Sequence, residues 1–160
     1  MSTSGNESAA DETSGVASTL NGLIETCKDG EQGFRSAAEG VTDPNLQRLF
    51  ESYSQQRSEF ANELQMEVKR LAEDPVDSGH VLGALHRGWL NIKAAVTGKD
   101  EGAIISECER GEDVAVRNYR EALDQSLPSN IRMIVERQFV QVKQAHDHVR
   151  SLEQAHSRNN

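Results

Sequence analysis

The sequence has few residues that interrupt helices and few that stack on nucleotides. Only three of its 160 residues are proline, and Pro44, Pro75 and Pro128 all fall between periodic segments. Proline breaks a helix when it lies in the interior, so this placement is typical of a helical protein. Aromatic residues make up 4% of the chain, which leaves no stacking platform for bases or nucleotides.

The chain also lacks a long apolar run and an excess of positive charge. No stretch of about 18 apolar residues is present, so no membrane span is expected. There are 26 acidic and 17 basic residues, and this net charge of −9 argues against a nucleic-acid partner. Residues 1–14 have neither the basic start nor the apolar stretch of a signal peptide, and they are predicted to form a disordered tail.

Cysteine is scarce, and the usual enzyme motifs are missing. Cys27 and Cys108 both lie on apolar helical stripes, as buried thiols of a cytosolic protein do, and this favours a cytoplasmic location. A disulfide between them is the alternative. The chain has no glycine-rich phosphate loop, no His-Glu-x-x-His and no nucleophile elbow, so the motifs indicate no enzyme class.

Apolar residues recur with helical spacing in four long segments. The predicted helices cover about 16–40, 44–72, 101–123 and from 129 to beyond 152, and no strand pattern of comparable strength is present. Asp43-Pro44 predicts a cap followed by proline at the first helical position. The first and last connections are short, which predicts an all-α four-helix bundle of two helical hairpins over residues 15–157.

The long connection between the second and third helices must cross the length of such a bundle. It is predicted to cross as a helix over about 78–97, because apolar residues follow a helical stripe there: Leu82, Leu85, Trp89, Ile92 and Val96. Arg87, Lys93 and Lys99 make it locally basic. One interpretation is a lid packed on the bundle and anchored by the single tryptophan. The other is an amphipathic helix that docks a protein partner or a membrane surface.

A short motif occurs twice. Cys27-Lys28-Asp29-Gly30-Glu31 and Cys108-Glu109-Arg110-Gly111-Glu112 share the pattern C-x-x-G-E, and each puts a glutamate on an apolar stripe. Carboxylates directed at a helical core are costly unless a cation or metal compensates them. The two matched glycines suggest either a close approach of two helices or a helix bulge.

The helix that follows each motif carries a basic residue with a ring three positions later. These pairs are Arg57-x-x-Phe60 and Lys143-x-x-His146, and residues three apart face the same way on a helix. A two-fold bundle would gather them with Glu31 and Glu112 in one polar layer.

This layout resembles the di-iron bundles of ferritin-like proteins, in which four helices supply four glutamates and two histidines. Gly111-Glu112 and Lys143-Gln144-Ala145-His146 are similar to the corresponding strings of rubrerythrin-type proteins. Four stretches resemble, more closely, an uncharacterised bacterial family of ferritin-like four-helix-bundle proteins: LIETCKDGEQGF, SYSQQRSEFANEL, LHRGWLNIKAAVTGKD and ECERGED. The similarity covers roughly residues 20–152 and implies a ferritin-like fold with a helical crossover.

The chain departs from the di-iron pattern at three of its six positions. The resemblance implies that Glu31, Glu112 and His146 match metal ligands, whereas Arg57 and Lys143 replace glutamates and Phe60 replaces a histidine. Two carboxylates and two cations balance without a metal, and arginine cannot deprotonate to ligate one. The preferred hypothesis is a buried ion-pair layer of Glu31, Arg57, Glu112 and Lys143 with no cofactor. The alternative is an iron or zinc site of Glu31, Glu112 and His146, joined by Glu109 or Cys108.

The expected role is therefore structural or protein-interacting rather than enzymatic, and the resemblance suggests a link to stress or stationary phase. Relatives of this architecture often pair helix faces, which implies a homo-oligomer, and the protein partner is not identified by the sequence. The alternative function is a metal-binding or redox protein of ferritin type.

Overall fold

The described part of the chain is helical. The computed structural model describes residues 3–71 and 88–159, with side chains from residue 11 onward. It contains α1 (Thr3–Gly40), α2 (Pro44–Arg70), α3 (Ile92–Thr97), α4 (Glu101–Leu123) and α5 (Ser129–Arg158). No strand occurs in these two ranges. The prediction of an all-α fold is confirmed.

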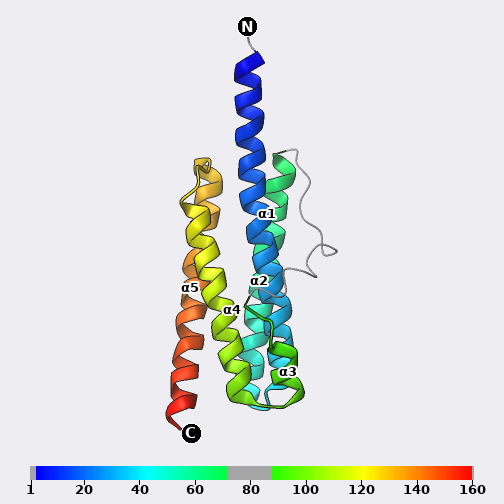
Figure 1. The fold of residues 1–160 in the computed structure, drawn as a ribbon, viewed down its shortest axis with the longest axis vertical. Helices are drawn as coiled ribbons and strands as arrows, with labels where there is room; N and C mark the ends of the chain where they lie inside the picture. Colours follow the sequence, from blue (N-terminus) through cyan, green and yellow to red (C-terminus); the bar gives the residue numbers. More distant parts are fainter. Residues whose placement is uncertain (1–2, 72–87, 160) are drawn as a thin grey trace.

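Four long helices lie side by side in two antiparallel hairpins (Figure 1). α1 packs along α2, α4 packs along α5, and the contact between α1 and α4 joins the hairpins. α2 ends at one end of the molecule and α4 begins at the other, so these two helices run in the same direction (Figure 1). No helix of the described residues is long and apolar enough to cross a membrane.

Helix boundaries follow the capping signals of the sequence. Pro44 opens α2, and the Asp43 carboxylate accepts a hydrogen bond from the backbone N–H of Asn45 at 2.8 Å. Asp100 caps α4 by accepting from the N–H of Ala103 at 3.1 Å. These side chains satisfy N–H groups that the first helical turn leaves without partners.

The N-terminal boundary of α1 differs from the expected one. The apolar pattern predicts a start near Val16, but α1 begins at Thr3 and extends past the neighbouring helix ends (Figure 1). Residues 1 and 2 lie outside the described residues. The disorder predicted for residues 1–14 stays a prediction, because a helix without tertiary neighbours is only marginally stable in water.

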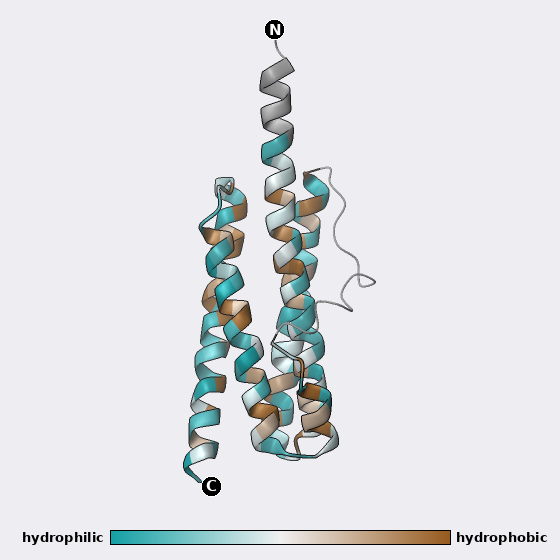
Figure 2. Cartoon of the chain, viewed as in Figure 1, coloured by the Kyte–Doolittle hydropathy of each residue, from teal (hydrophilic) through white to brown (hydrophobic). Residues whose placement is uncertain are grey.

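The core consists of two apolar clusters stacked along the long axis. Hydrophobic residues recur along the inner sides of the helices (Figure 2). One cluster is nearest the N-terminal end of α1 and includes Leu20, Ile24, Leu64 and Val135. The other surrounds Phe34 at the opposite end. On α1, α2 and α4 the boundary between the two clusters lies at the same height along the long axis. The polar layer was expected at this height.

α3 is shorter than the crossover helix predicted for about 78–97. Residues 88–91 are not helical, and Gly88 has a φ of 87°, which is in the left-handed region that glycine tolerates. The helix therefore starts at Ile92. Residues 72–87, with Leu82, Leu85 and Arg87, lie outside the described residues.

Trp89 anchors this segment to α1 and α4. Its side chain is buried, and its ring packs edge-on against Phe34 with the centroids 5.1 Å apart. A Cβ atom on Gly33 of α1 would lie 2.3 Å from this ring, and one on Gly111 of α4 would lie 2.2 Å from it. The glycines therefore make room for the indole. Because Trp89 and Ile92 are buried, the described part of the segment packs against the bundle as the lid interpretation expects.

Candidate functional site

The layer between the two clusters contains one fully buried ion pair. Arg57 comes from α2 and Glu112 from α4, and their side chains are 1% and 0% exposed. Nη1 donates to Oε1 and Nη2 donates to Oε2, each at 2.6 Å. This bidentate geometry is the strongest that arginine and a carboxylate can form.

The surroundings of Arg57 are shaped to the guanidinium. Its Cζ lies 5.4 Å from the centroid of the Phe34 ring, and Nε donates to the amide oxygen of Gln56 at 3.3 Å. A Cβ atom on Gly30 would lie 3.1 Å from Nη1, so this glycine gives the arginine its space. Burial lowers the pKa of Arg57, but the adjacent Glu112 more than offsets burial, so the pKa is raised and the group stays charged.

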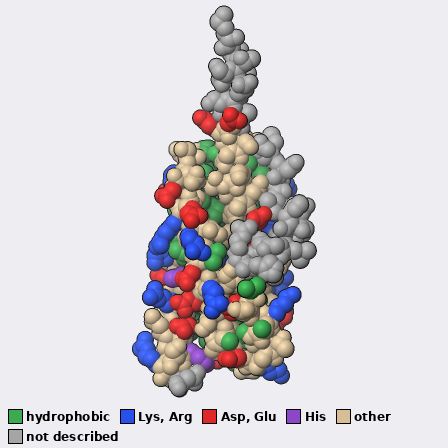
Figure 3. Space-filling model, in the orientation of Figure 1, with side chains coloured by type: hydrophobic (Ala, Val, Ile, Leu, Met, Phe, Trp, Pro, Cys, Tyr) green, Lys and Arg blue, Asp and Glu red, His purple; other side chains and the backbone are tan. Residues whose placement is uncertain are grey.

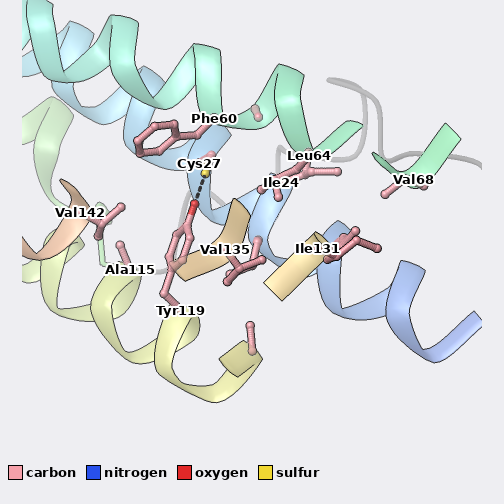
Figure 4. Close-up of a cluster of buried hydrophobic side chains, with 14 of the residues drawn as sticks. Ile24, Cys27, Phe60, Leu64, Val68, Ala115, Tyr119, Ile131, Val135 and Val142 are labelled. Carbon is pink, nitrogen blue, oxygen red and sulfur yellow. Dashed lines mark hydrogen bonds between the residues drawn. The ribbon is translucent and has the colours of Figure 1, made fainter. Parts of the chain in front are cut away.

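A chain of polar side chains runs beside this pair toward the surface. Cys27 Sγ lies 3.1 Å from Tyr119 Oη, and Tyr119 donates to Gln138 Oε1 at 2.8 Å. A dashed line marks the contact between Cys27 and Tyr119 in Figure 4. Gln138 in turn donates to Glu63 Oε1 at 2.8 Å, and Glu63 pairs with Arg137. Each buried polar group in this series of side chains is hydrogen-bonded, as buried polar groups in protein interiors generally are. The series links all four long helices.

The two cysteines are poorly placed for thiol chemistry. Burial raises the pKa of Cys27 to about 11 and that of Cys108 well above its ordinary value. Both thiols are free and buried, so no disulfide joins them. Because the thiolate is the reactive form, neither thiol is activated as a nucleophile.

The remaining residues of the predicted layer lie apart from the buried pair. Glu31 is 19% exposed and faces Arg35 of its own helix at 3.6 Å. Lys143 is 44% exposed and pairs with Asp147 at 3.3 Å. Of the four residues expected in one layer, the structure therefore brings only Arg57 and Glu112 together.

His146 joins α4 to α5 instead of facing Glu112. Its Nε2 lies 2.6 Å from Asp113 Oδ1 and its Nδ1 lies 3.0 Å from Asp147 Oδ1. Burial lowers the pKa of His146, but the hydrogen bonds to Asp147 and Asp113 outweigh it and the pKa is raised. Over α4 and α5, acidic and basic side chains intermingle on the visible face (Figure 3).

The predicted metal ligands do not form a metal centre. Glu31, Glu112 and His146 each have a different partner, and Glu112 uses both oxygens on Arg57. Among residues 11–71 and 88–159, no group of three or more His, Cys, Asp or Glu is arranged to hold a metal ion.

Sequence reasoning overlooked Gln138 and Gly33. Gln138 interrupts the apolar stripe of α5 between Val135 and Val142, which is a readable signal for a buried amide. Gly33 lies one heptad before Gly40, and both sit under bulky side chains of the α3 segment, Trp89 and Val96. That repeat of small residues was visible in the sequence, but the side chains that fill it were not.

Comparison with known protein families identifies one family that matches the chain. A family described as a domain of unknown function, DUF2383, matches residues 15–125, which include both Arg57 and Glu112. The chain belongs to this family. The match supports the expectation of an uncharacterised family, and it leaves α5 with Lys143 and His146 beyond its end. None of the curated proteins compared with the chain matches it.

Proposed function

We propose that this member of the DUF2383 family is a ferritin-like four-helix bundle with a structural or protein-interaction role, in which an ion pair takes the place of a di-metal site. The observation that carries the proposal is the bidentate pair of Arg57 and Glu112 between the two apolar clusters. A fixed guanidinium repels a metal ion, and it already neutralises the carboxylate that a metal would need. Two free, buried cysteines support a cytoplasmic location as part of this proposal.

The pair explains how a charged layer can sit in a helical core. Breaking a buried ion pair on one side leaves an uncompensated charge, which costs about 3–5 kcal/mol. Replacing both partners with apolar residues is often neutral, because desolvation of the two charges is then avoided. If the layer has only a structural role, replacing one partner should destabilise the protein strongly, and replacing both partners should have little effect.

Metal analysis of the purified protein tests the proposal directly. Protein purified without chelators should hold no stoichiometric iron, zinc or manganese when measured by elemental mass spectrometry. Tightly bound metal that is lost on Glu31→Ala, Glu112→Ala or His146→Ala would overturn the ion-pair function and favour the ferritin-type metal protein.

A double-mutant cycle tests the same layer by stability. Arg57→Met and Glu112→Leu should each lower the free energy of unfolding by about 3–5 kcal/mol, and the double variant should regain most of the loss. Arg35→Met, which alters the exposed pair with Glu31, is the matched control and should cost less than about 1 kcal/mol. Additive losses from the two buried changes would contradict a coupled pair.

A further inference from the structure

Trp89 enters the bundle from a part of the chain that otherwise lies at the surface. It belongs to the non-helical residues 88–91, and its side chain is 2% exposed whereas that of the next residue, Leu90, is 62% exposed. Gly88 precedes it with a φ of 87°, and a Cβ atom there would lie 2.8 Å from the Cα of Gly111. The segment therefore inserts one ring into the bundle while the residues beside that ring stay at the surface.

The backbones of two helices wall the space that holds this ring. A Cβ atom on Gly33 of α1 would lie 2.3 Å from both Cδ2 and Cε3 of the indole, and one on Gly111 of α4 would lie 2.2 Å from Cε2 and 2.4 Å from Nε1. Cδ2 and Cε2 are the two atoms that the five-membered and six-membered rings share, so both glycines face the ring fusion. Phe34 adds an aromatic wall, edge-on to the indole with the centroids 5.1 Å apart. We call this space the Gly33–Gly111 slot.

The slot should stay open when the indole is absent. The space left by a large side chain shrinks when neighbouring side chains move into it, and the glycine walls have no side chains that could move. Phe34 is also held by other contacts, because its ring centroid lies 5.2 Å from that of Tyr53 and 5.4 Å from Cζ of Arg57. A cavity with apolar walls stays dry and can take up a small aromatic molecule. An empty slot of this kind is therefore a ready site for a flat ring.

We propose that the Gly33–Gly111 slot is a binding site for a planar bicyclic aromatic molecule of indole size, and that Trp89 occupies it as a tethered ligand. Two glycine backbones fit the flat ring fusion, and the edge-on ring of Phe34 favours an aromatic guest over an aliphatic one. The tether makes the site self-inhibited, because a ring on the same chain competes at an effective concentration on the order of millimolar. A free aromatic molecule binds when residues 88–91 lift away. This inference is independent of the role of the buried ion pair.

Isothermal titration calorimetry of the full chain with indole tests the proposal. Trp89→Ala should bind one indole per chain, and indole should raise the melting temperature of this variant. The wild-type protein should bind indole at least about tenfold more weakly, because Trp89 already fills the slot. Benzene lacks the second ring, so it should bind Trp89→Ala more weakly than indole does.

Two double variants show whether indole binds in the slot. Adding Gly111→Leu to Trp89→Ala fills the slot from α4 and should abolish indole binding. Adding Gly22→Ala instead is the matched control, because a Cβ atom on Gly22 has nothing within 4 Å, and binding should be unchanged.

The readouts separate loss of the site from loss of the fold. If Trp89→Ala does not fold alone, refolding with indole should restore the helical circular dichroism spectrum and cooperative melting, and absence of this rescue would refute the proposal. A folded Trp89→Ala that binds no indole, or one that binds it no more tightly than the wild type, would refute it equally. Metal content, which tests the proposed function, is unaffected by these results.

Discussion

At the scale of single residues, the most informative groups are those whose partners differ from the ones their spacing suggested. Arg57 lies opposite Glu112 alone, and Lys143 faces outward to Asp147. His146 was a candidate metal ligand, but it bridges two surface carboxylates on neighbouring helices. Its two ring nitrogens can both donate only when the imidazole is protonated, so the bridge depends on pH.

The His146 bridge predicts a specific pH dependence of stability. The pKa of His146 is raised in the folded state, so its contribution is fully present below the unfolded pKa of about 6.5 and is lost as pH rises through the higher folded pKa. The charged groups around it are Asp113, Asp147, Lys143 and Glu109. Urea unfolding between pH 6 and 8 should show a loss of up to about 1 kcal/mol that His146→Gln abolishes.

The control for this prediction is His148→Gln, which removes a histidine from the same helix. His148 Nδ1 lies 3.1 Å from Tyr53 Oη, and the two rings meet edge-on. Its replacement should keep the wild-type pH slope above neutrality. If stability still falls between pH 6 and 8 in the His146→Gln variant, another group causes the pH dependence.

At the scale of secondary structure elements, the glycines of α1 differ in whether a side chain from another element packs against them. Gly33 and Gly40 lie beneath Trp89 and Val96, whereas a Cβ on Gly22 would have nothing within 4 Å. The same residue type therefore has opposite significance at positions with similar helical environments. Where a neighbour fills the space, glycine permits the packing, and elsewhere it only lowers helix stability.

Two alanine substitutions should consequently have opposite signs. Gly33→Ala places a methyl group 2.3 Å from the Trp89 ring and should cost at least about 1–3 kcal/mol. Gly22→Ala should stabilise by up to about 1 kcal/mol through helix propensity. Denaturant unfolding followed by fluorescence of the single tryptophan measures both changes. Equal effects at the two sites would argue against the Trp89 anchor.

At the scale of the whole molecule, the family match and the folding unit have different boundaries. The match ends at residue 125, but α5 contributes Ile131, Val135, Val142 and Val149 to the core. Four such buried side chains contribute on the order of 10 kcal/mol, which is comparable to the total stability of a domain. α5 is therefore part of the folding unit.

Deleting residues 126–160 should accordingly abolish cooperative thermal unfolding. Calorimetry should show no sharp transition, since Val116 and Tyr119 on α4 would lose their cover. Deleting only residues 157–160 should leave the melting temperature nearly unchanged, because residues 157–159 are exposed. A cooperative transition in the longer deletion would show that the matched region folds alone.

Local sequence signals determined the helices of this protein, and the tertiary structure decided which polar groups meet. Apolar periodicity, the cap at Asp43 and the placement of proline depend on neighbours within a few residues, so the sequence alone predicted four long helices and the level of the polar layer. Two features depended on residues distant in sequence. One is the identity of the cation that faces Glu112, and the other is the packing of Trp89 into the space beside Gly33 and Gly111. Helical spacing defines the face on which a side chain lies. The rotation and separation of the packed helices then select its partner, and these arise only when all the elements assemble.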